Sequence, residues 1–366
     1  MVDATSPEEL SSKYRESYDK HRSSMKKPNI LVAGGTGAGK SSLVNLVFGA
    51  KTAEVGAGQP VTRGIQRFDH PYAVLFDSEG YETGEESQAR FRDAILSQLD
   101  DGKRTGKDAI HLVWYCISQA GHRVLDVDIS TINSTKARRI PVCIVLSQAD
   151  KVSKEESEAL HGLLQRDCPD VSIFETSTDA SLPLDTDKII SWSAEHLEQG
   201  ARSAFIAGVR GGVPIKKSEG MRIVGTHTVT AAGIAVNPIP LSDAPLLIAN
   251  QVSMIARLAT LWDLEAIKTA SAGGIAGQAL AIAGRSLAGN LLKLIPGVGS
   301  VAGAAINASV ASAITGGVGY ATNEICARIH ADEINGTLKD IASYFDAEIV
   351  SNLVKNYLSS VTQKSA

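Results

Sequence analysis

The chain has 366 residues, of which 43% are hydrophobic, and a formal net charge of −4 at pH 7. That length allows two ordinary domains with cores of their own, and the weakly negative charge gives no electrostatic footprint for a nucleic acid. The cysteines lack both the paired spacing of a zinc site and the density of a disulfide scaffold. We therefore expect a folded intracellular protein with no nucleic-acid partner and with buried, reduced thiols at Cys116, Cys143, Cys168 and Cys326.

Residues 1–27 are polar and charged, and they lack the apolar core of a secretory signal. They predict an exposed helix that begins after the capping residue Ser6. Residues 28–200 alternate short β-rich runs with helical patterns, which is typical of βαβ units in a three-layer α/β domain with a mainly parallel sheet. Six strands are predicted within residues 29–34, 65–70, 73–77, 109–118, 140–147 and 171–177, with surface helices within residues 90–99, 127–137 and 154–166.

The stretch "NILVAGGTGAGKSSLVNLVFG", residues 29–49, places a glycine turn between an apolar strand and a helix. Residues 34–41 fit the pattern G-x-x-x-x-G-K-[ST], whose glycines let backbone N–H groups wrap closely around phosphate oxygens. Lys40 is expected to neutralise the β- and γ-phosphates, and Ser41 to ligate Mg²⁺. The predicted phosphate-binding residues are Gly34, Gly35, Thr36, Gly37, Ala38, Gly39, Lys40, Ser41 and Ser42.

Further motifs follow in an order that argues against a chance glycine-rich turn. Thr62, in "GAGQPVTRGI", is placed to close over Mg²⁺ and the γ-phosphate. The stretch "AVLFDSEGYE" ends an apolar strand with D-x-x-G, so Asp77 is expected to hold a metal-bound water and Gly80 to offer its N–H to the γ-phosphate. Arg123, in "SQAGHRVLD", is a candidate charge stabiliser, and a solvated loop charge is the plainer alternative.

Two more strand ends complete the pattern. "IPVCIVLSQADKV" is a buried strand followed by Asp150, and "VSIFETSTD" is a strand followed by Ser177. With these motifs, residues 28 to about 180 resemble a GTPase of the translation-factor-related class, and "GGTGAGKSSLVN" is similar to its Era-like, septin and interferon-inducible branches. The resemblance implies a Ras-like G domain that binds GTP and GDP with Mg²⁺, and base recognition by Gln148, Asp150 and Ser177.

Two departures from the family pattern bear on specificity and rate. The usual base-recognition motif Asn-Lys-x-Asp reads Ser-Gln-Ala-Asp at residues 147–150. Asp150 still accepts two hydrogen bonds from guanine, and Gln148 is expected to lie over the base without a cation, so GTP is favoured over ATP. Tyr81 stands where Ras-like enzymes carry the water-orienting glutamine, so intrinsic hydrolysis is expected to be slow unless a second protomer at the nucleotide face helps.

Composition changes again after the predicted α/β domain. Residues 201–220 contain "GGVPIKKSEG", with glycines, a proline and a charge cluster, and are the predicted linker. Residues 221–366 are rich in Gly and Ala and predict an all-α helical domain. Pro238 and Pro240 interrupt this domain before a helix capped by Ser242. Small residues spaced four apart let helices approach closely at Gly273, Gly277, Gly299 and Gly303.

The sequence of the helical domain fits either a water-soluble or a membrane environment. Apart from His227, no acidic or basic residue lies between Arg222 and Asp243 or between Lys293 and Glu324, and each stretch is long enough to span a bilayer. Because Gly, Pro and polar residues interrupt both, a buried soluble domain competes with a hairpin that docks on or inserts into membranes. Residues 221–330 resemble the uncharacterised helical domain that follows the GTPase domain of some Era-like proteins, and that resemblance implies membrane contact through residues 223–323.

The tail predicts a C-terminal amphipathic helix, because apolar residues recur at helical spacing. These residues are Ile334, Leu338, Ile341, Phe345, Ile349 and Leu353. His111 and the tryptophans are expected to serve packing.

Three functions are weighed. The leading expectation is a Mg²⁺-dependent GTPase switch in the cytoplasm, peripheral or integral at a membrane, whose nucleotide state repositions the helical domain. A nucleotide-regulated structural protein that assembles on membranes and hydrolyses little is the rival, and a P-loop ATPase or kinase is the third.

Overall fold

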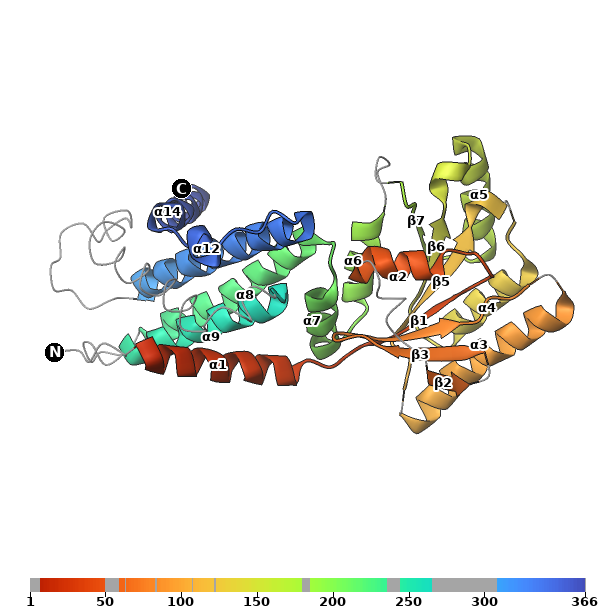
Figure 1. Cartoon of the computed structure of the whole chain (residues 1–366), viewed down its shortest axis with the longest axis horizontal. Coiled ribbons are helices and arrows are strands. Elements are labelled where there is room, and N and C mark those ends of the chain that lie inside the picture. Colours follow the sequence, from red (N-terminus) through yellow and green to blue (C-terminus); the bar gives the residue numbers. More distant parts are fainter. Residues whose placement is uncertain are drawn as a thin grey trace. The chain divides into compact units, whose positions relative to one another are not determined.

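The structure is a computed structural model that describes residues 7–49, 59–62, 64–82, 84–106, 108–121, 123–179, 185–235, 244–264 and 308–365. The chain divides into two compact units. We call Met25–Ile215 the sheet unit, and Met1–Ser24 together with Lys216–Ala366 the helical unit. Each unit has a hydrophobic core cluster of its own, and Figure 1 shows the elements of both.

The sheet unit contains a seven-stranded sheet in the order β2-β3-β4-β1-β5-β6-β7. The strands are β1 (Asn29–Gly34), β2 (Gln59–Thr62), β3 (Ile65–Asp69), β4 (Val74–Ser78), β5 (Leu112–Ser118), β6 (Val142–Ser147) and β7 (Ser172–Glu175). The run β4-β1-β5-β6-β7 is parallel, whereas β3 pairs antiparallel with both β2 and β4. The α/β class and the six predicted strands are confirmed, and β2 is an additional strand. Because β2 contains Pro60 and lies at the sheet edge, where a missing N–H is tolerated, its sequence looked like a loop.

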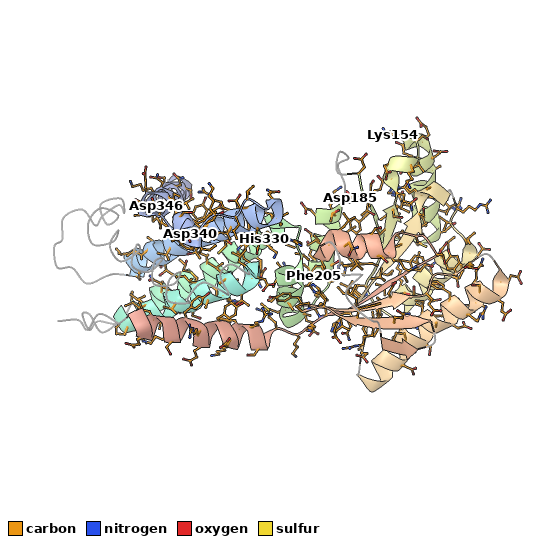
Figure 2. The ribbon with its side chains drawn as sticks, in the orientation of Figure 1. Lys154, Asp185, Phe205, His330, Asp340 and Asp346 are labelled. Carbon is orange, nitrogen blue, oxygen red and sulfur yellow. The ribbon has the colours of Figure 1, made fainter. Side chains whose placement is uncertain are left out.

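Helices cover both faces of this sheet. They are α2 (Lys40–Phe48), α3 (Glu85–Thr105), α4 (Asp126–Ala137), α5 (Lys154–Asp167), α6 (Thr186–Glu195) and α7 (Gln199–Gly208), with short turns η1 (Gln119–Gly121) and η2 (Ala149–Lys151). Neighbouring residues of β5 point to opposite faces, as strand geometry requires. Tyr115 joins the core formed with α3, α4 and α5. Trp114 packs on the other face against Phe48 of α2 and Phe205 of α7, the latter labelled in Figure 2.

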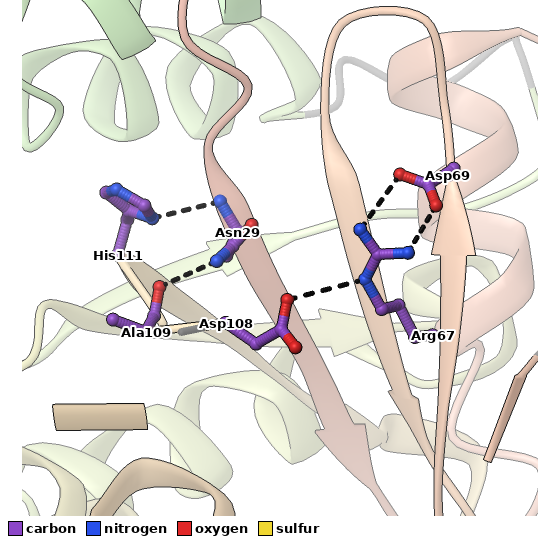
Figure 3. A network of polar contacts seen from close by, with 6 residues as sticks. All are labelled: Asn29, Arg67, Asp69, Asp108, Ala109 and His111. Carbon is purple, nitrogen blue, oxygen red and sulfur yellow. Dashed lines mark hydrogen bonds and ion pairs between the residues drawn. The ribbon is translucent and has the colours of Figure 1, made fainter. Parts of the chain in front are cut away.

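Polar contacts fix the amino-terminal end of β1. The Asn29 N–H donates to Nδ1 of His111 at 3.0 Å, and the Asn29 amide donates to the carbonyl of Ala109 at 2.9 Å (Figure 3). Nearby, Nε of Arg67 lies 3.5 Å from Oδ1 of Asp108. Burial lowers the pKa of His111, so its ring accepts this hydrogen bond in the neutral state. His111 therefore has the structural role that was expected.

The helical unit consists of α1 (Pro7–Ser24), most of α8 (Val213–Ile234), α9 (Ala244–Trp262), α12 (Ala308–Asn335), α13 (Ile341–Tyr344) and α14 (Ala347–Ser365). The N-terminal helix was expected to be exposed, but α1 packs along α9. Its Tyr14 is only 4% exposed, and His21 lies 3.3 Å from the hydroxyl of Ser253. The many charged residues of α1 suggested an exposed helix. A few buried side chains are nevertheless enough to pack it against α9.

Residues 201–220, the predicted linker, lie mostly in α7 and α8, and the division of the units between Ile215 and Lys216 falls within this range. The glycines mark only the break between these helices, and Pro214 occupies the first turn of α8, where a missing N–H costs little. The tail is not one helix from residue 334, because Gly336 adopts a φ of 68° and ends α12. The C-terminal amphipathic helix is α14, which buries Val350, Leu353 and Leu358.

Several predictions fall outside the described residues. They concern Pro238, Pro240, Ser242, Gly273, Gly277, Gly299 and Gly303. Among the helices that the structure describes, none is long and apolar enough to cross a membrane. All four cysteines are buried and free of disulfides.

A pair of glycines in α8 tests the packing of the helical unit. A Cβ on Gly220 would lie 2.1 Å from Oδ1 of Asn323, a fully buried side chain that also accepts the indole N–H of Trp262 at 2.9 Å. Gly220→Ala is therefore expected to destabilise the unit by about 2 kcal/mol. Gly225→Ala, which meets nothing within 4 Å, should stabilise it by about 0.5–1 kcal/mol. Urea unfolding followed by circular dichroism measures both, and equal midpoints would contradict the packing.

Candidate functional site

The predicted site residues gather where the parallel strands end. Gly34 ends β1, Asp77 is the penultimate residue of β4, and β6 ends directly before Gln148. Ser177 follows two residues after β7. In open α/β sheets this carboxyl edge is where ligands bind. Motifs that are far apart along the chain therefore lie at the same edge of the sheet.

The glycine turn has the geometry of a phosphate-binding loop. Gly34 has a φ of 138°, and a Cβ there would lie 2.1 Å from the carbonyl oxygen of Cys116. Gly39 has a φ of 84°, and its added Cβ would come within 2.9 Å of the Ser147 side chain. Only glycine fits at both positions. The backbone then enters α2 at Lys40, which directs the amino-terminal end of that helix toward the turn.

Lys40 folds back over the turn. Its Nζ donates to the carbonyls of Gly34 at 2.9 Å and Gly35 at 3.0 Å. Burial lowers the pKa of Lys40, and the carboxylate of Asp77 opposes that shift. The ammonium group is thus held beside the loop and close to the D-x-x-G carboxylate, where it can meet the oxygens of a bound phosphate.

Asp77 has the environment of a ligand-binding carboxylate. Its Oδ1 is buried and has no hydrogen-bond partner among the described residues. Burial raises the pKa of Asp77, while Lys40 lowers it. A buried carboxylate oxygen without a partner is costly unless a water or cation completes it, so the residues fit Mg²⁺. Ser41 and Ser42 are exposed in the first turn of α2, and Thr62 is the last residue of β2, opposite Ile65.

The D-x-x-G glycine lies against the phosphate loop. A Cβ on Gly80 would come within 2.4 Å of the backbone nitrogen of Thr36 and 2.7 Å of the Gly35 carbonyl carbon. The next residue, Tyr81, accepts the Thr36 N–H through its carbonyl at 3.2 Å. Its hydroxyl points elsewhere, and donates to Oδ1 of Asp128 in α4 at 2.6 Å. The tyrosine that replaces the expected glutamine is therefore engaged in a structural contact.

Hydrogen bonds join the loop after β6, where base recognition was predicted, to the glycine turn. The Ser147 hydroxyl donates to the carbonyl of Ala38 at 2.8 Å, and the Gln148 amide donates to the carbonyl of Gly37 at 3.3 Å. Gln148 adopts a φ of 57°, a left-handed conformation that places this amide over the loop. Sequence reasoning noted Ser147 only as a departure from asparagine, and its position in the motif was the signal that it belongs to the site.

Asp150 and Ser177 meet at the open side of this loop. The buried Ser177 hydroxyl donates to Oδ1 of Asp150, and in turn accepts the N–H of Asp179 at 2.9 Å. Asp150 is exposed, so its carboxylate is oriented by Ser177 while remaining open to a ligand. This is the arrangement that a base-recognising carboxylate needs.

Arg123 takes no part in the contacts described above. Arg123 is exposed in the loop between η1 and α4. Its role as a charge stabiliser stays a prediction. His122 lies outside the described residues.

The comparisons with known proteins agree with this geometry. A protein-family model described as 50S ribosome-binding GTPase matches residues 29–148. This part of the chain is similar to P-loop GTPase domains. GTPase Der from Citrifermentans bemidjiense is 29% identical over 138 residues, which cover 36% of this chain and 29% of Der. The probable GTP-binding protein EngB from Aquifex aeolicus is 29% identical over 133 residues, which cover 35% of this chain and 70% of EngB.

The chain thus spans less than a third of the length of the Der relatives that it matches. Among solved structures, a crystal structure of a probable GTP-binding protein EngB covers 46% of this chain and 97% of its own, at 15% identity and a TM-score of 0.35. The residues matched by the family model, 29–148, lie within the sheet unit.

The Ser147 contact gives a prediction for the GTPase domain. Ser147→Ala removes a buried hydrogen bond and leaves the Ala38 carbonyl without this donor, which loosens the phosphate loop. Affinities for GTP and GDP are expected to fall together by roughly three- to tenfold. Fluorescence titration with labelled nucleotides measures both affinities, and unchanged values would show that the loop is rigid without Ser147.

Proposed function

We propose that the protein is a Mg²⁺-dependent GTPase switch that binds and slowly hydrolyses GTP and uses its nucleotide state to reposition the helical unit. The observation that carries the proposal is the convergence of Lys40, Asp77, Gly80 and Asp150 at one edge of the sheet. The matches to proteins named as GTPases support the same reading.

Different residues would bind the phosphate end and the base end of a nucleotide. The backbone N–H groups of the glycine turn and the Lys40 ammonium would bind the phosphates. Asp150, oriented by Ser177, would accept the N1–H and amino hydrogens of guanine, which adenine cannot supply in that pattern. Ser41, Thr62 and, through a water, Asp77 would hold Mg²⁺, which when bound neutralises phosphate charge.

The hydrolysis rate follows from Tyr81. With its hydroxyl bound to Asp128, this side chain does not orient an attacking water, so slow turnover is the consequence. A second copy at the nucleotide face would compensate by supplying a cation, and the exposed Arg123 is the candidate for that role.

Membrane contact is part of the proposal, with a cytoplasmic protein that docks through residues 223–323. Val229 in α8 is 73% exposed and Leu246 in α9 is 57% exposed, and both lie within this range. Apolar side chains exposed to this degree would be available to a lipid surface. The rival function, a membrane-bound structural protein with little hydrolysis, is favoured by the same Tyr81 contact, whereas Asp150 disfavours an ATPase.

Single-turnover hydrolysis separates these functions. The full chain would be incubated with a slight deficit of GTP and Mg²⁺, with and without phosphatidylcholine–phosphatidylglycerol vesicles, and both phosphate release and sedimentation would be recorded. Slow GTP turnover with nucleotide-dependent sedimentation supports the proposal. Sedimentation without any turnover favours the structural protein, and ATP turnover that exceeds GTP turnover would overturn the assignment.

A further inference from the structure

Tyr81 contacts three parts of the sheet unit, which are the phosphate loop, α3 and α4. Through its carbonyl it accepts the Thr36 N–H of the phosphate loop at 3.2 Å. Its ring lies beside Gly35, where an added Cβ would be 3.3 Å from Cζ, and packs edge-on against Phe91 of α3 with centroids 4.9 Å apart. Its hydroxyl reaches Asp128 of α4. No sequence motif predicts the last of these contacts.

Asp128 is buried and accepts several hydrogen bonds, of which the one from the Tyr81 hydroxyl is the shortest. The residue is 1% exposed, and a buried carboxylate persists only when hydrogen bonds replace its water. Oδ1 accepts from Tyr81 at 2.6 Å and from the Tyr115 hydroxyl at 2.8 Å, while Oδ2 accepts the Leu125 N–H at 2.9 Å. Burial raises the pKa of Asp128, and these three hydrogen bonds lower it.

The two ends of Tyr81 restrain the residue before it. Gly80 is the last residue of the D-x-x-G motif and directly precedes Tyr81. Its backbone lies so close to the phosphate loop that a Cβ would not fit. With its carbonyl bound to Thr36 and its hydroxyl bound to α4, Tyr81 is held through both its main chain and its side chain, and this restrains the position of the adjacent Gly80. The Gly80 N–H is the donor that the γ-phosphate would meet.

We propose that Asp128 is a positioning residue that acts through the Tyr81 hydroxyl to hold the D-x-x-G segment against the phosphate loop in readiness for a terminal phosphate. The inference rests on the proposed function. It couples α4 to the γ-phosphate end of the site, so that a partner which shifts α4 would change the preference for triphosphate over diphosphate. GDP lacks the group that Gly80 would contact, and its binding does not depend on this restraint.

The chain offers a matched pair of variants. Tyr81→Phe and Tyr115→Phe each remove one hydroxyl from the same oxygen of Asp128, but only Tyr81 belongs to the D-x-x-G segment. Affinities of the full chain for GTPγS and GDP would be measured with Mg²⁺ for both variants. Tyr81→Phe is expected to lower the GTPγS-to-GDP affinity ratio roughly five- to tenfold, and Tyr115→Phe should leave the ratio unchanged.

A cycle with Asp128 adds a second test that overall stability does not affect. Asp128→Ala should lower the same ratio as Tyr81→Phe, and the double variant should lower it no further, because the two residues act through one contact. An unchanged ratio in Tyr81→Phe, an equal change in Tyr115→Phe, or additive effects in the double variant would each overturn the inference. Wild-type protein that binds neither nucleotide would overturn the proposed function, and this inference with it.

Discussion

Replacing Lys40 by alanine is expected to weaken binding of GTP and GDP by at least about 100-fold, because the phosphates lose the partly buried ammonium group beside the loop. In the structure its Nζ is held by the carbonyls of Gly34 and Gly35. Phosphate oxygens would take over these contacts and add the energy of a charge-assisted hydrogen bond. Calorimetric titration of the variant with each nucleotide and Mg²⁺ measures the loss.

Lys154→Ala is the matched control for this variant. Lys154 also begins a helix of the sheet unit, but its side chain is 85% exposed (Figure 2) and forms only a weak surface pair with Glu158. Its removal should leave both affinities unchanged. If Lys40→Ala bound nucleotide as tightly as this control, the phosphate-loop assignment would be wrong.

Replacing Asp150 by asparagine is expected to exchange guanine for xanthine. The carboxylate would accept two hydrogen bonds from guanine, and its loss should weaken GTP binding by about 100-fold. Xanthine presents a carbonyl where guanine has its amino group, so the asparagine amide can donate to that carbonyl while its oxygen accepts from N1–H. Ser177 keeps a hydroxyl donor for the new amide oxygen. Competition between GTP and XTP measures the change.

Asp170→Asn serves as the control because Asp170 also lies in the sheet unit, has a φ of 60° that asparagine tolerates, and has a side chain that is 88% exposed. This variant should retain the wild-type preference for GTP. An Asp150→Asn protein that still prefers GTP to XTP would show that another residue reads the base.

The sequence predicts the backbone geometry of the glycine turn well, because the requirements of this turn are local. A glycine turn between a strand and a helix restricts the backbone so strongly that Gly34 and Gly39 have no substitutes. The same holds for β1, β5 and β6, whose buried apolar runs are continuous along the chain. Proline in a short edge strand removed that signal, which is why β2 was missed.

The contacts between elements could not be predicted in the same way. Asp128 lies in the first turn of α4, where an acidic residue is ordinary, and nothing local indicates that it receives the Tyr81 hydroxyl. Ser147 supplies a hydroxyl for a tie to the phosphate loop that a pattern of residue types does not reveal. The helical unit shows the same limit, because α1 has a polar sequence and packs on α9 through a few side chains.

The most direct test of GTP binding at this site is isothermal titration calorimetry of the folded full chain with GTP and with ATP, each in excess Mg²⁺. Saturable heat is expected with GTP at one site per chain, and affinity for ATP should be at least about tenfold weaker, since Asp150 would accept hydrogen bonds that guanine offers and adenine does not. Absence of heat with GTP and with GDP, or tighter binding of ATP, would contradict it.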